Sequence, residues 1–362
     1  MAFGRMSARG GFGGLGLLGG AVPPYLGQVA TSSQVPNARV GVAQVMAESR
    51  HIARDDITAV ALLIPTWYVN HSNLQETAIS GTTTATASFN FPLGTFSQVK
   101  FGGAASGPLA GGITFQTDFT PVSIPRGSIF GVRAFLQCSG GIPFLSPVDN
   151  GATFVTNCGR DEANGERFQF AASGLTDLTM GGTITSTTDG GRYGWRPVGI
   201  IAKTRRASIT FIADSRVMGL ADFYNDGSYN VGELARAIGP SFAYINDGIA
   251  GQSTTSWLAS NPLQLALAQF CSHKIPQLAI NDFGLSGYAA YLARQQTIFA
   301  ALGNKNIFGV TVPPQTTSTD SWATSANQSV SSRESDRLTY NAALRSATIV
   351  NLAGYFDFAS VA

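Results

Sequence analysis

Three small or polar residues, each placed after an apolar run, are of the types that ester hydrolysis needs. Ser215 lies in the segment 211–219, where apolar residues lead into Asp214 and a helix-like stretch follows; Gly251 and Asn281 come after two later apolar runs. In open α/β sheets, chemistry takes place at the carboxyl ends of strands. A serine there can act as a nucleophile, and a glycine N–H and an asparagine amide can stabilise an oxyanion. The pattern therefore predicts one shared site.

The order of these residues resembles that of the SGNH (GDSL-like) hydrolase family, and the resemblance begins near Arg205. The first family block, Gly-Asp-Ser, is similar to residues 213–215, with alanine in place of the glycine. The second block centres on a glycine that Gly251 matches, and the third block, Gly-x-Asn-Asp, is similar to residues 279–282.

The resemblance implies a role for each of these residues. Ser215 is the nucleophile, and its own N–H, the N–H of Gly251 and the amide of Asn281 form the oxyanion hole. Asp214 and Asp282 have supporting roles, and Asp214 is expected to brace the turn rather than to relay charge. No cofactor and no metal are implied. The family favours carbohydrate O-deacetylation or the hydrolysis of short acyl esters.

Each residue also has a purely structural interpretation. Ser215 can cap the helix that follows it. Gly251 can satisfy a turn, and Asn281 with Asp282 can form an Asx-turn. All three structural interpretations would have to hold together, which favours a shared site.

The catalytic histidine of the family is not found. Its block, Asp-x-x-His, has its last candidate at residues 357–360, which end in serine. A serine hydroxyl needs an adjacent base, and histidine is the usual one. His51 and His71 lie in the N-terminal half, far from the motif blocks, and His273 precedes a strand that puts it ~20 Å from Asn281 at ~3.3 Å per residue.

Three explanations account for this absence. The first is that the domain is incomplete at its C-terminus, with residues 347–354 forming the strand that precedes the histidine-bearing loop. The second is a fold kept without catalysis. The third is a histidine donated by another chain.

Strand-like and helix-like segments alternate over residues 201–362 and predict an α/β domain with parallel βαβ units. This agrees with the flavodoxin-like, three-layer architecture that the resemblance implies. The expected helices are listed by their residues: 231–239, 261–270 with Pro262 in the first turn, 288–302 and 335–345.

Residues 41–200 show short alternating runs separated by Gly, Pro and Asn, which favours an antiparallel β-sandwich of jelly-roll-like topology as an accessory domain. The run 47–56 is the most charged part of this half and is expected to be a solvated helix or loop. Trp67, Tyr68, Tyr193 and Trp195 are either core residues, which we favour, or a platform on which sugars stack.

Composition sets further limits on a chain of 362 residues, of which 12% are charged and 44% hydrophobic. The net charge of +2 gives no reason to expect nucleic acid. No run reaches the ~18 apolar residues of a membrane span. Residues 1–40 contain dense glycine, a poor signal-peptide core, and are expected to form a flexible arm. Cys138 and Cys158 could pair, although three free thiols including Cys271 are favoured.

Two functions of different class remain. The first is a serine esterase acting on acyl (acetyl) esters of a carbohydrate, with the β-domain as an accessory. The second is a structural or receptor-binding virion protein of the phage spike or fibre type, whose hydrolase-like domain is inactive or only binds glycan. An extracellular or virion location, acylated polysaccharide as partner and a homotrimer or virion assembly through the arm are expected with these functions.

Overall fold

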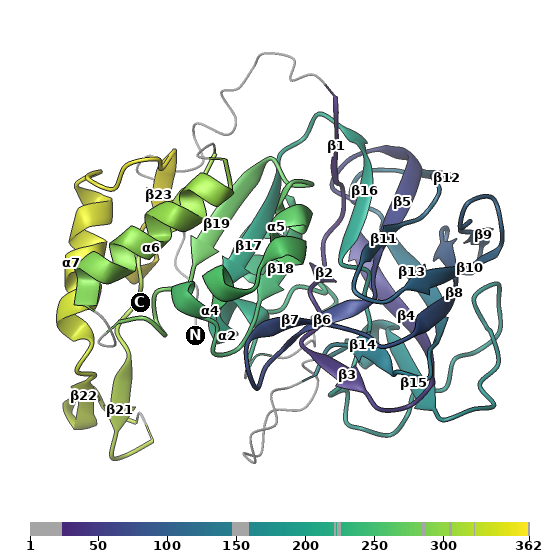
Figure 1. The fold of residues 1–362 in the computed structure, drawn as a ribbon, viewed down its shortest axis with the longest axis horizontal. Coiled ribbons are helices and arrows are strands. Elements are labelled where there is room, and N and C mark those ends of the chain that lie inside the picture. Colours follow the sequence, from purple (N-terminus) through teal and green to yellow (C-terminus); the bar gives the residue numbers. More distant parts are fainter. Residues whose placement is uncertain are drawn as a thin grey trace.

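The computed structural model describes residues 24–146, 159–220, 222, 226–283, 287–303, 306–321 and 323–360. Figure 1 shows two parts, with two antiparallel sheets at the right of the view and a parallel sheet flanked by helices at the left. Among the helices of the described ranges, none is both long and apolar enough to cross a membrane.

The N-terminal part is built from two antiparallel sheets, and a single apolar cluster contains side chains from both. The first sheet contains β1 (Tyr25–Gln28), β16 (Gly199–Thr204), β5 (Ile57–Pro65), β11 (Thr114–Gln116) and β12 (Thr120–Ile124). The second contains β10 (Ser106–Ala110), β8 (Thr82–Asn90), β13 (Ile129–Gln137), β4 (Gln44–Ile52), β15 (Arg167–Ala171) and β9 (Phe96–Gln98).

Alternation of side chains explains why both sheets enclose that cluster. Along β13, Val132, Ala134 and Leu136 point to the shared cluster and are buried, as expected from the period of two of a strand. Trp67 and Trp195 are also buried, and Tyr193 packs partly buried against the same cluster. Tyr68 also packs partly buried against this cluster, so these four aromatic residues belong to the core or its edge, as we favoured.

The charged run 47–56 was predicted wrongly. Most of it belongs to β4, which pairs on both sides, with β13 and with β15. Glu48 is buried there because Arg133 Nε and Arg50 Nη2 each lie 2.9 Å from its carboxylate. Charged side chains that form ion pairs with one another can be buried in a strand, even where the sequence alone predicts that they face solvent.

The C-terminal part contains a parallel sheet whose strand order is β2–β18–β17–β19, continued to β20 and β23 by the parallel bridge between Lys274 and Ile307. β2 comes from the N-terminal segment and lies at the edge of the sheet. Of the strands after residue 200, the first is β17, and it lies inside the sheet between β18 and β19, which is the flavodoxin-like order. The prediction of parallel βαβ units is confirmed. The strands are β2 (Ser33–Gln34), β17 (Ser208–Ala213), β18 (Ala243–Gly248), β19 (His273–Gln277), β20 (Phe308–Val310) and β23 (Gly354–Phe356).

Helices cover both faces of this sheet. Phe211 and Ile212 are neighbours in β17 and point to opposite faces: Phe211 belongs to the cluster of Leu234, whereas Ile212 belongs to that of Tyr291 and Tyr340. The helices are α2 (Ser215–Met218), α3 (Glu233–Ile238), α4 (Thr254–Ala259), α5 (Pro262–Ala268), α6 (Gly287–Ala301) and α7 (Glu334–Arg345). The four helices expected from the sequence are α3, α5, α6 and α7.

Residues 24–40, expected to belong to a flexible arm, are part of the fold. β1 pairs with β16 and β2 pairs with β18, so this segment joins both parts of the molecule. Gln28 and Ser33 are buried and hydrogen-bonded to each other, with Nε2 donating to Oγ over 2.9 Å. Residues 1–23, where the glycine is densest, lie outside the described residues, and the expected boundary at residue 200 falls inside β16.

The strand expected at residues 347–354 is also corrected. Ala347 and Asn351 have positive φ values of 54° and 66°, which a strand does not tolerate. The strand is β23, three residues long, and it delivers Asp357 directly at its carboxyl end.

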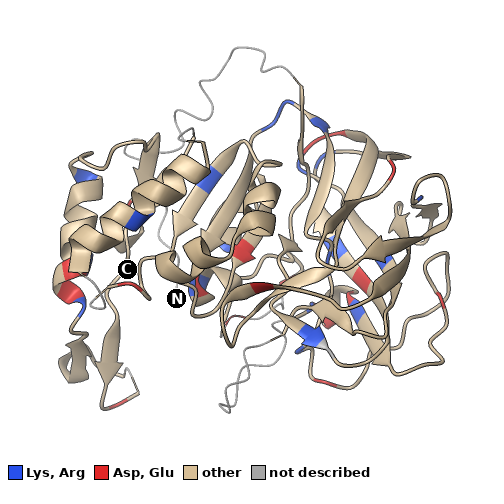
Figure 2. Cartoon of the chain, in the orientation of Figure 1, with Lys and Arg blue, Asp and Glu red and all other residues tan. Residues whose placement is uncertain are grey.

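Smaller elements complete the chain, and charged residues are scattered singly over both parts (Figure 2). Cys138 and Cys271 are free and buried, and Cys158 lies outside the described residues. The remaining elements are β3 (Ala38–Val40) with β14 (Ile142–Phe144), β6 (Trp67–Asn70) with β7 (Gln75–Ala78), β21 (Thr316–Ser318) with β22 (Gln328–Val330), and the 3₁₀ turns η1 (Glu162–Asn164), η2 (Ser325–Asn327) and η3 (Phe358–Ser360).

Candidate active site

Ser215 lies at the carboxyl end of β17 and is the first residue of α2. Asp214, not Ser215, caps this helix, because its side chain accepts a hydrogen bond from Arg216 N over 3.0 Å. The Ser215 side chain makes no hydrogen bond within the part of the chain that the structure describes. Ser215 therefore does not cap α2. It is half-exposed, and its hydroxyl forms no hydrogen bond with a described residue.

Asp214 is almost fully buried directly before the serine. Burial raises the pKa of this carboxyl to about 7, although the Arg216 N–H and the charge of the Arg216 guanidinium act to lower it. Because its carboxylate is used on the backbone of α2, Asp214 braces the turn that presents Ser215.

Gly251 lies in the loop after β18, which is the neighbour of β17 in the sheet. Its φ of +81° is in the left-handed region, which a glycine adopts without strain. The loop is anchored to β17 because Ile249 N donates to Ala213 O over 3.0 Å.

Asn281 follows β19, the neighbour of β17 on the other side. Its Nδ2 donates to Gln252 O over 2.9 Å, which joins the loop of Asn281 to the loop of Gly251. An amide nitrogen carries two hydrogens, so one N–H of Asn281 is used here. Within the described residues the second has no partner, and it is the donor that an oxyanion would take.

Asp282 connects the loop of Asn281 to α4. It is buried and accepts hydrogen bonds from Thr254 N at 2.8 Å and Thr254 Oγ1 at 2.5 Å, and it pairs with Arg294 at 3.1 Å. These bonds attach the loop of Asn281 to the start of α4. An Asx-turn therefore does not explain Asn281 and Asp282.

The three histidines lie in different places. His51 is buried in β4 between Ser49 and the Thr31 carbonyl, and burial lowers its pKa to about 3. His273 begins β19, so it lies at the amino edge of the sheet, opposite Asn281, as the sequence predicted.

His71 does not lie where its position in the sequence suggests. It lies in the turn of the β6–β7 hairpin, and Leu74 of the same turn reaches Gly251: a Cβ placed on Gly251 would lie 3.7 Å from Leu74 Cδ2. The expectation that His71 is far from the motif blocks was therefore wrong for its hairpin. The imidazole makes no hydrogen bond with Ser215 or with any other residue that the structure describes.

The loop that resembles the histidine block contacts α2, the helix that begins with Ser215. Phe358 packs under the guanidinium of Arg216, with Arg216 Cζ 5.8 Å from the ring centroid. Asp357 pairs with Arg345 at 2.8 Å, and the Ser360 hydroxyl donates to Asp357 O. The position at which the resemblance places a histidine thus holds a serine whose hydroxyl is already used.

A cluster beside Ser215 was missed by sequence reasoning. Arg216 forms an ion pair of 2.6 Å with Glu233, and Gln277 Nε2 donates to Glu233 over 2.7 Å. These residues come from the starts of α2 and α3 and the end of β19, so no local pattern links them. The cluster joins α2, which begins with Ser215, to α3 and β19.

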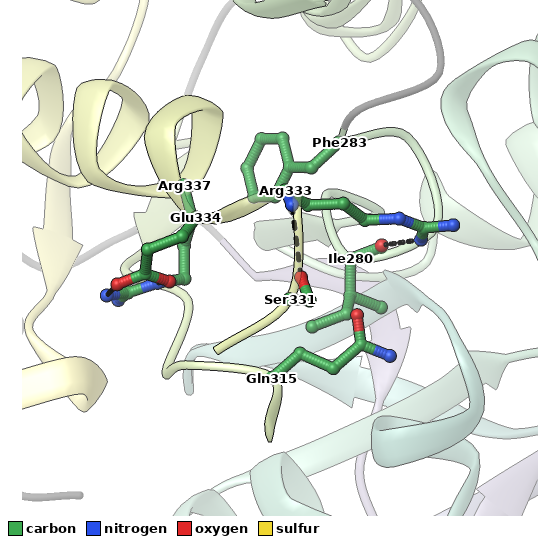
Figure 3. A pocket seen from close by; sticks show the side chains of 7 residues that line it. All are labelled: Ile280, Phe283, Gln315, Ser331, Arg333, Glu334 and Arg337. Atoms are coloured by element: carbon green, nitrogen blue, oxygen red, sulfur yellow. Dashed lines mark hydrogen bonds and ion pairs between the residues drawn. The ribbon is translucent and has the colours of Figure 1, made fainter. Parts of the chain in front are cut away.

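A small hollow of about 10 Å³ opens beside the Asn281 loop (Figure 3). Arg333 crosses it and donates to Ile280 O over 2.9 Å, and Phe283 lies at its edge. Gln315, Ser331, Glu334 and Arg337 complete its lining.

Comparisons with known proteins add only distant likenesses. No family model and no curated protein matches the chain. A lipase/acylhydrolase from Enterococcus faecalis is similar at 20% identity, with a TM-score of 0.25, over 31% of this chain and 59% of its own. A carbohydrate esterase family 2 enzyme with a carbohydrate binding domain from Corynascus thermopiles (Myceliophthora fergusii) is similar at 14% identity, with a TM-score of 0.32, over 91% of this chain and 86% of its own.

A family two carbohydrate esterase from Clostridium thermocellum is similar at 12% identity, with a TM-score of 0.30, over 92% of this chain and 88% of its own. At these TM-scores the likenesses carry no functional inference.

Proposed function

We propose that this protein is a serine esterase that removes acyl groups, acetyl in particular, from carbohydrate. The observation that carries the proposal is the unused hydrogen-bonding capacity at the ends of three adjacent parallel strands. Ser215 has an unbonded hydroxyl, Gly251 turns its loop beside it, and Asn281 keeps one amide N–H unbonded among the described residues.

The chemistry follows from these three groups. Ser215 Oγ attacks the ester carbonyl and loses its proton to a base, while the carbonyl oxygen becomes an oxyanion. The N–H groups of Ser215 and Gly251 and the Asn281 amide stabilise that oxyanion. The sugar hydroxyl then leaves with the proton, and water releases the acyl group from Ser215.

The base is the open part of this mechanism. Of the three histidines, His71 is the one whose own hairpin contacts the site, through Leu74. His71 is therefore the residue of the described chain to test first. A histidine from another chain is the alternative that the same assay examines.

The carbohydrate assignment comes from the family resemblance and suits the setting of the site. The site lies at the carboxyl edge of the parallel sheet, where Ser215 and Asn281 are half-exposed and open to a substrate. We further propose that the two antiparallel sheets form a jelly-roll-like sandwich that serves as the accessory domain, with the division near residue 200. Assembly into a trimer or a virion stays a prediction, since residues 1–23 lie outside the described residues.

The test is release of p-nitrophenol from p-nitrophenyl acetate, and of acetate from an acetylated polysaccharide, by the full chain. Ser215→Ala is expected to reduce both to background, and His71→Ala to do the same if that imidazole is the base. Equal background rates for the wild type and Ser215→Ala would contradict the esterase. Activity that needs Ser215 but not His71 would assign the base to another chain or to a carboxylate.

A further inference from the structure

The β6–β7 hairpin belongs to the antiparallel part, yet it lies along α4 and reaches the loop of Gly251 (Figure 1). Its contact with α4 begins at Glu76, whose N–H donates to Ser260 Oγ over 3.1 Å. It ends at Leu74, whose side chain lies against Gly251. One hairpin therefore runs along the whole of α4, from the end of the helix to the loop that precedes it.

Glu76 supplies the cap that α5 lacks. The first N–H groups of a helix have no partner within the helix, and the Asn261 side chain at the cap position makes no capping bond. Glu76 Oε1 accepts instead from Leu263 N at 2.9 Å and from Gln264 N at 2.7 Å. The orientation of α5 thus depends on a carboxylate from a distant segment of the chain.

Gln264, the third residue of α5, continues this connection into the interior. It is fully buried, and its Nε2 donates to Asp247 Oδ1 over 2.7 Å. Its Oε1 accepts from Gln252 Nε2 over 3.4 Å. Asp247 Oδ2 and Gln252 Oε1 are buried without a partner among the described residues, so Gln264 is the polar connection of both side chains there.

Gln252 carries the connection to both proposed oxyanion donors. It follows Gly251 directly in the loop, and its carbonyl accepts the Asn281 Nδ2–H over 2.9 Å. A displacement of Gln252 would therefore move the Gly251 N–H and release the Asn281 amide together.

We propose that the β6–β7 hairpin sets the position of the oxyanion loop, residues 249–253, with Glu76 and Gln264 as positioning residues. The loop is held from the hairpin side at Gly251 by Leu74, and from the α5 side at Gln252. The expected effect on catalysis rests on the proposed esterase function, whereas the positioning of the loop by the hairpin does not.

The experiment measures amide hydrogen exchange and steady-state kinetics on the full chain. Glu76→Gln keeps the shape and removes the charge, and Gln264→Met removes both polar contacts at similar volume. The control is Asp55→Asn, which breaks a different contact between the two parts, the 3.0 Å ion pair with Arg206 near the amino end of β17.

In Glu76→Gln and Gln264→Met, exchange in a peptide covering residues 249–256 should be faster than in the wild type. In Glu76→Gln, exchange at the start of α5 should rise as well, because Glu76 caps this helix. The remaining peptides of the parallel part should be unchanged. The kcat of the esterase should fall by about 10- to 100-fold with little change in KM, because misplaced catalytic groups lose rate. Asp55→Asn should change neither quantity.

Unchanged exchange in that peptide for folded Glu76→Gln would overturn the proposal, and so would exchange that rises equally throughout the parallel part. Should Glu76→Gln fail to fold, Leu74→Ala tests the other end of the hairpin with the same peptide. Hydrogen exchange tests the positioning role of the hairpin even if the wild type has no esterase activity. Failure of the proposed esterase function is therefore distinguishable from failure of the positioning proposal.

Discussion

Paired buried charges in the antiparallel part contrast with half-exposed polar side chains at the strand ends of the parallel part. In the antiparallel part, Glu166 and Arg196 are each 1% exposed and form an ion pair of 2.6 Å, and Glu48 is shared by two arginines. In the parallel part, Ser215 and Asn281 keep hydrogen-bonding capacity that no described residue uses. Buried charges that satisfy one another hold a fold together, whereas groups with unused capacity at a strand edge are available for chemistry.

The largest expected effect tests the antiparallel side of this comparison. Glu166→Ala should lower the free energy of unfolding by about 3–5 kcal/mol, because it leaves the buried Arg196 guanidinium without its carboxylate. Urea denaturation measures this. Glu162→Ala is the control: that carboxylate is 44% exposed and pairs with Arg160, so its loss should cost at most about 1 kcal/mol. Equal losses would show that burial does not separate the two pairs.

Asn281→Ala tests the parallel side. Loss of one oxyanion donor should reduce kcat by about 10²–10³-fold, with unfolding free energy changed far less. Steady-state kinetics with p-nitrophenyl acetate measure it. Asn306→Ala is the matched control, since its Nδ2 also donates to a backbone carbonyl, Ser272 O, but at the opposite edge of the sheet. A structural role alone for Asn281 would leave kcat unchanged.

Asp214→Asn gives a smaller effect with a defined pH dependence. Burial raises the folded-state pKa of Asp214 to about 7 from 3.8, so the stability from its protonated form is present below about pH 3.8 and is lost as pH rises toward 7. Asparagine is neutral throughout. The variant should therefore gain about 2 kcal/mol relative to the wild type between pH 5 and pH 7, at about 1.4 kcal/mol per unit.

Urea denaturation of both proteins at several pH values gives this difference. Taking the difference removes the contribution of His51, whose lowered pKa acts in the opposite direction, since its stability is lost as pH falls below 6.5. A difference that does not change with pH would mean that Asp214 is not titrating in this range.

Gly251→Ala should have the smallest effect on stability. An alanine at φ +81° costs about 1–2 kcal/mol. Gly94→Ala, at φ +99° with open space around it, should cost a similar amount of unfolding free energy. The kcat should fall in Gly251→Ala but not in Gly94→Ala, as measured by the same ester assay. A fall in both variants would assign the loss to general destabilisation.

Local patterns predicted a large share of this structure. Apolar runs followed by Ser215, Gly251 and Asn281 located the ends of β17, β18 and β19, and Pro262 marked the first turn of α5. Periodicity could locate these elements because each element buries one face, and the residues that end it lie next to it in the sequence. The same reasoning placed residues 347–354 in a strand, because it did not detect the positive φ values there.

Proximity between distant segments was beyond the sequence. Nothing near Glu76 shows that it caps α5, and nothing near Glu48 shows that Arg133 pairs with it.

The sequence by itself determined the type and order of the candidate site residues after the parallel strands, and the serine at residue 360 where the resemblance expects a histidine. The tertiary structure decided which groups meet: the hairpin carrying His71 at the loop of Gly251, and Arg216 with Glu233 beside the nucleophile. The physical reason is that local preferences act over a few residues. Ion pairs and helix caps instead depend on distant chain segments, which come together because the apolar side chains of both parts are buried.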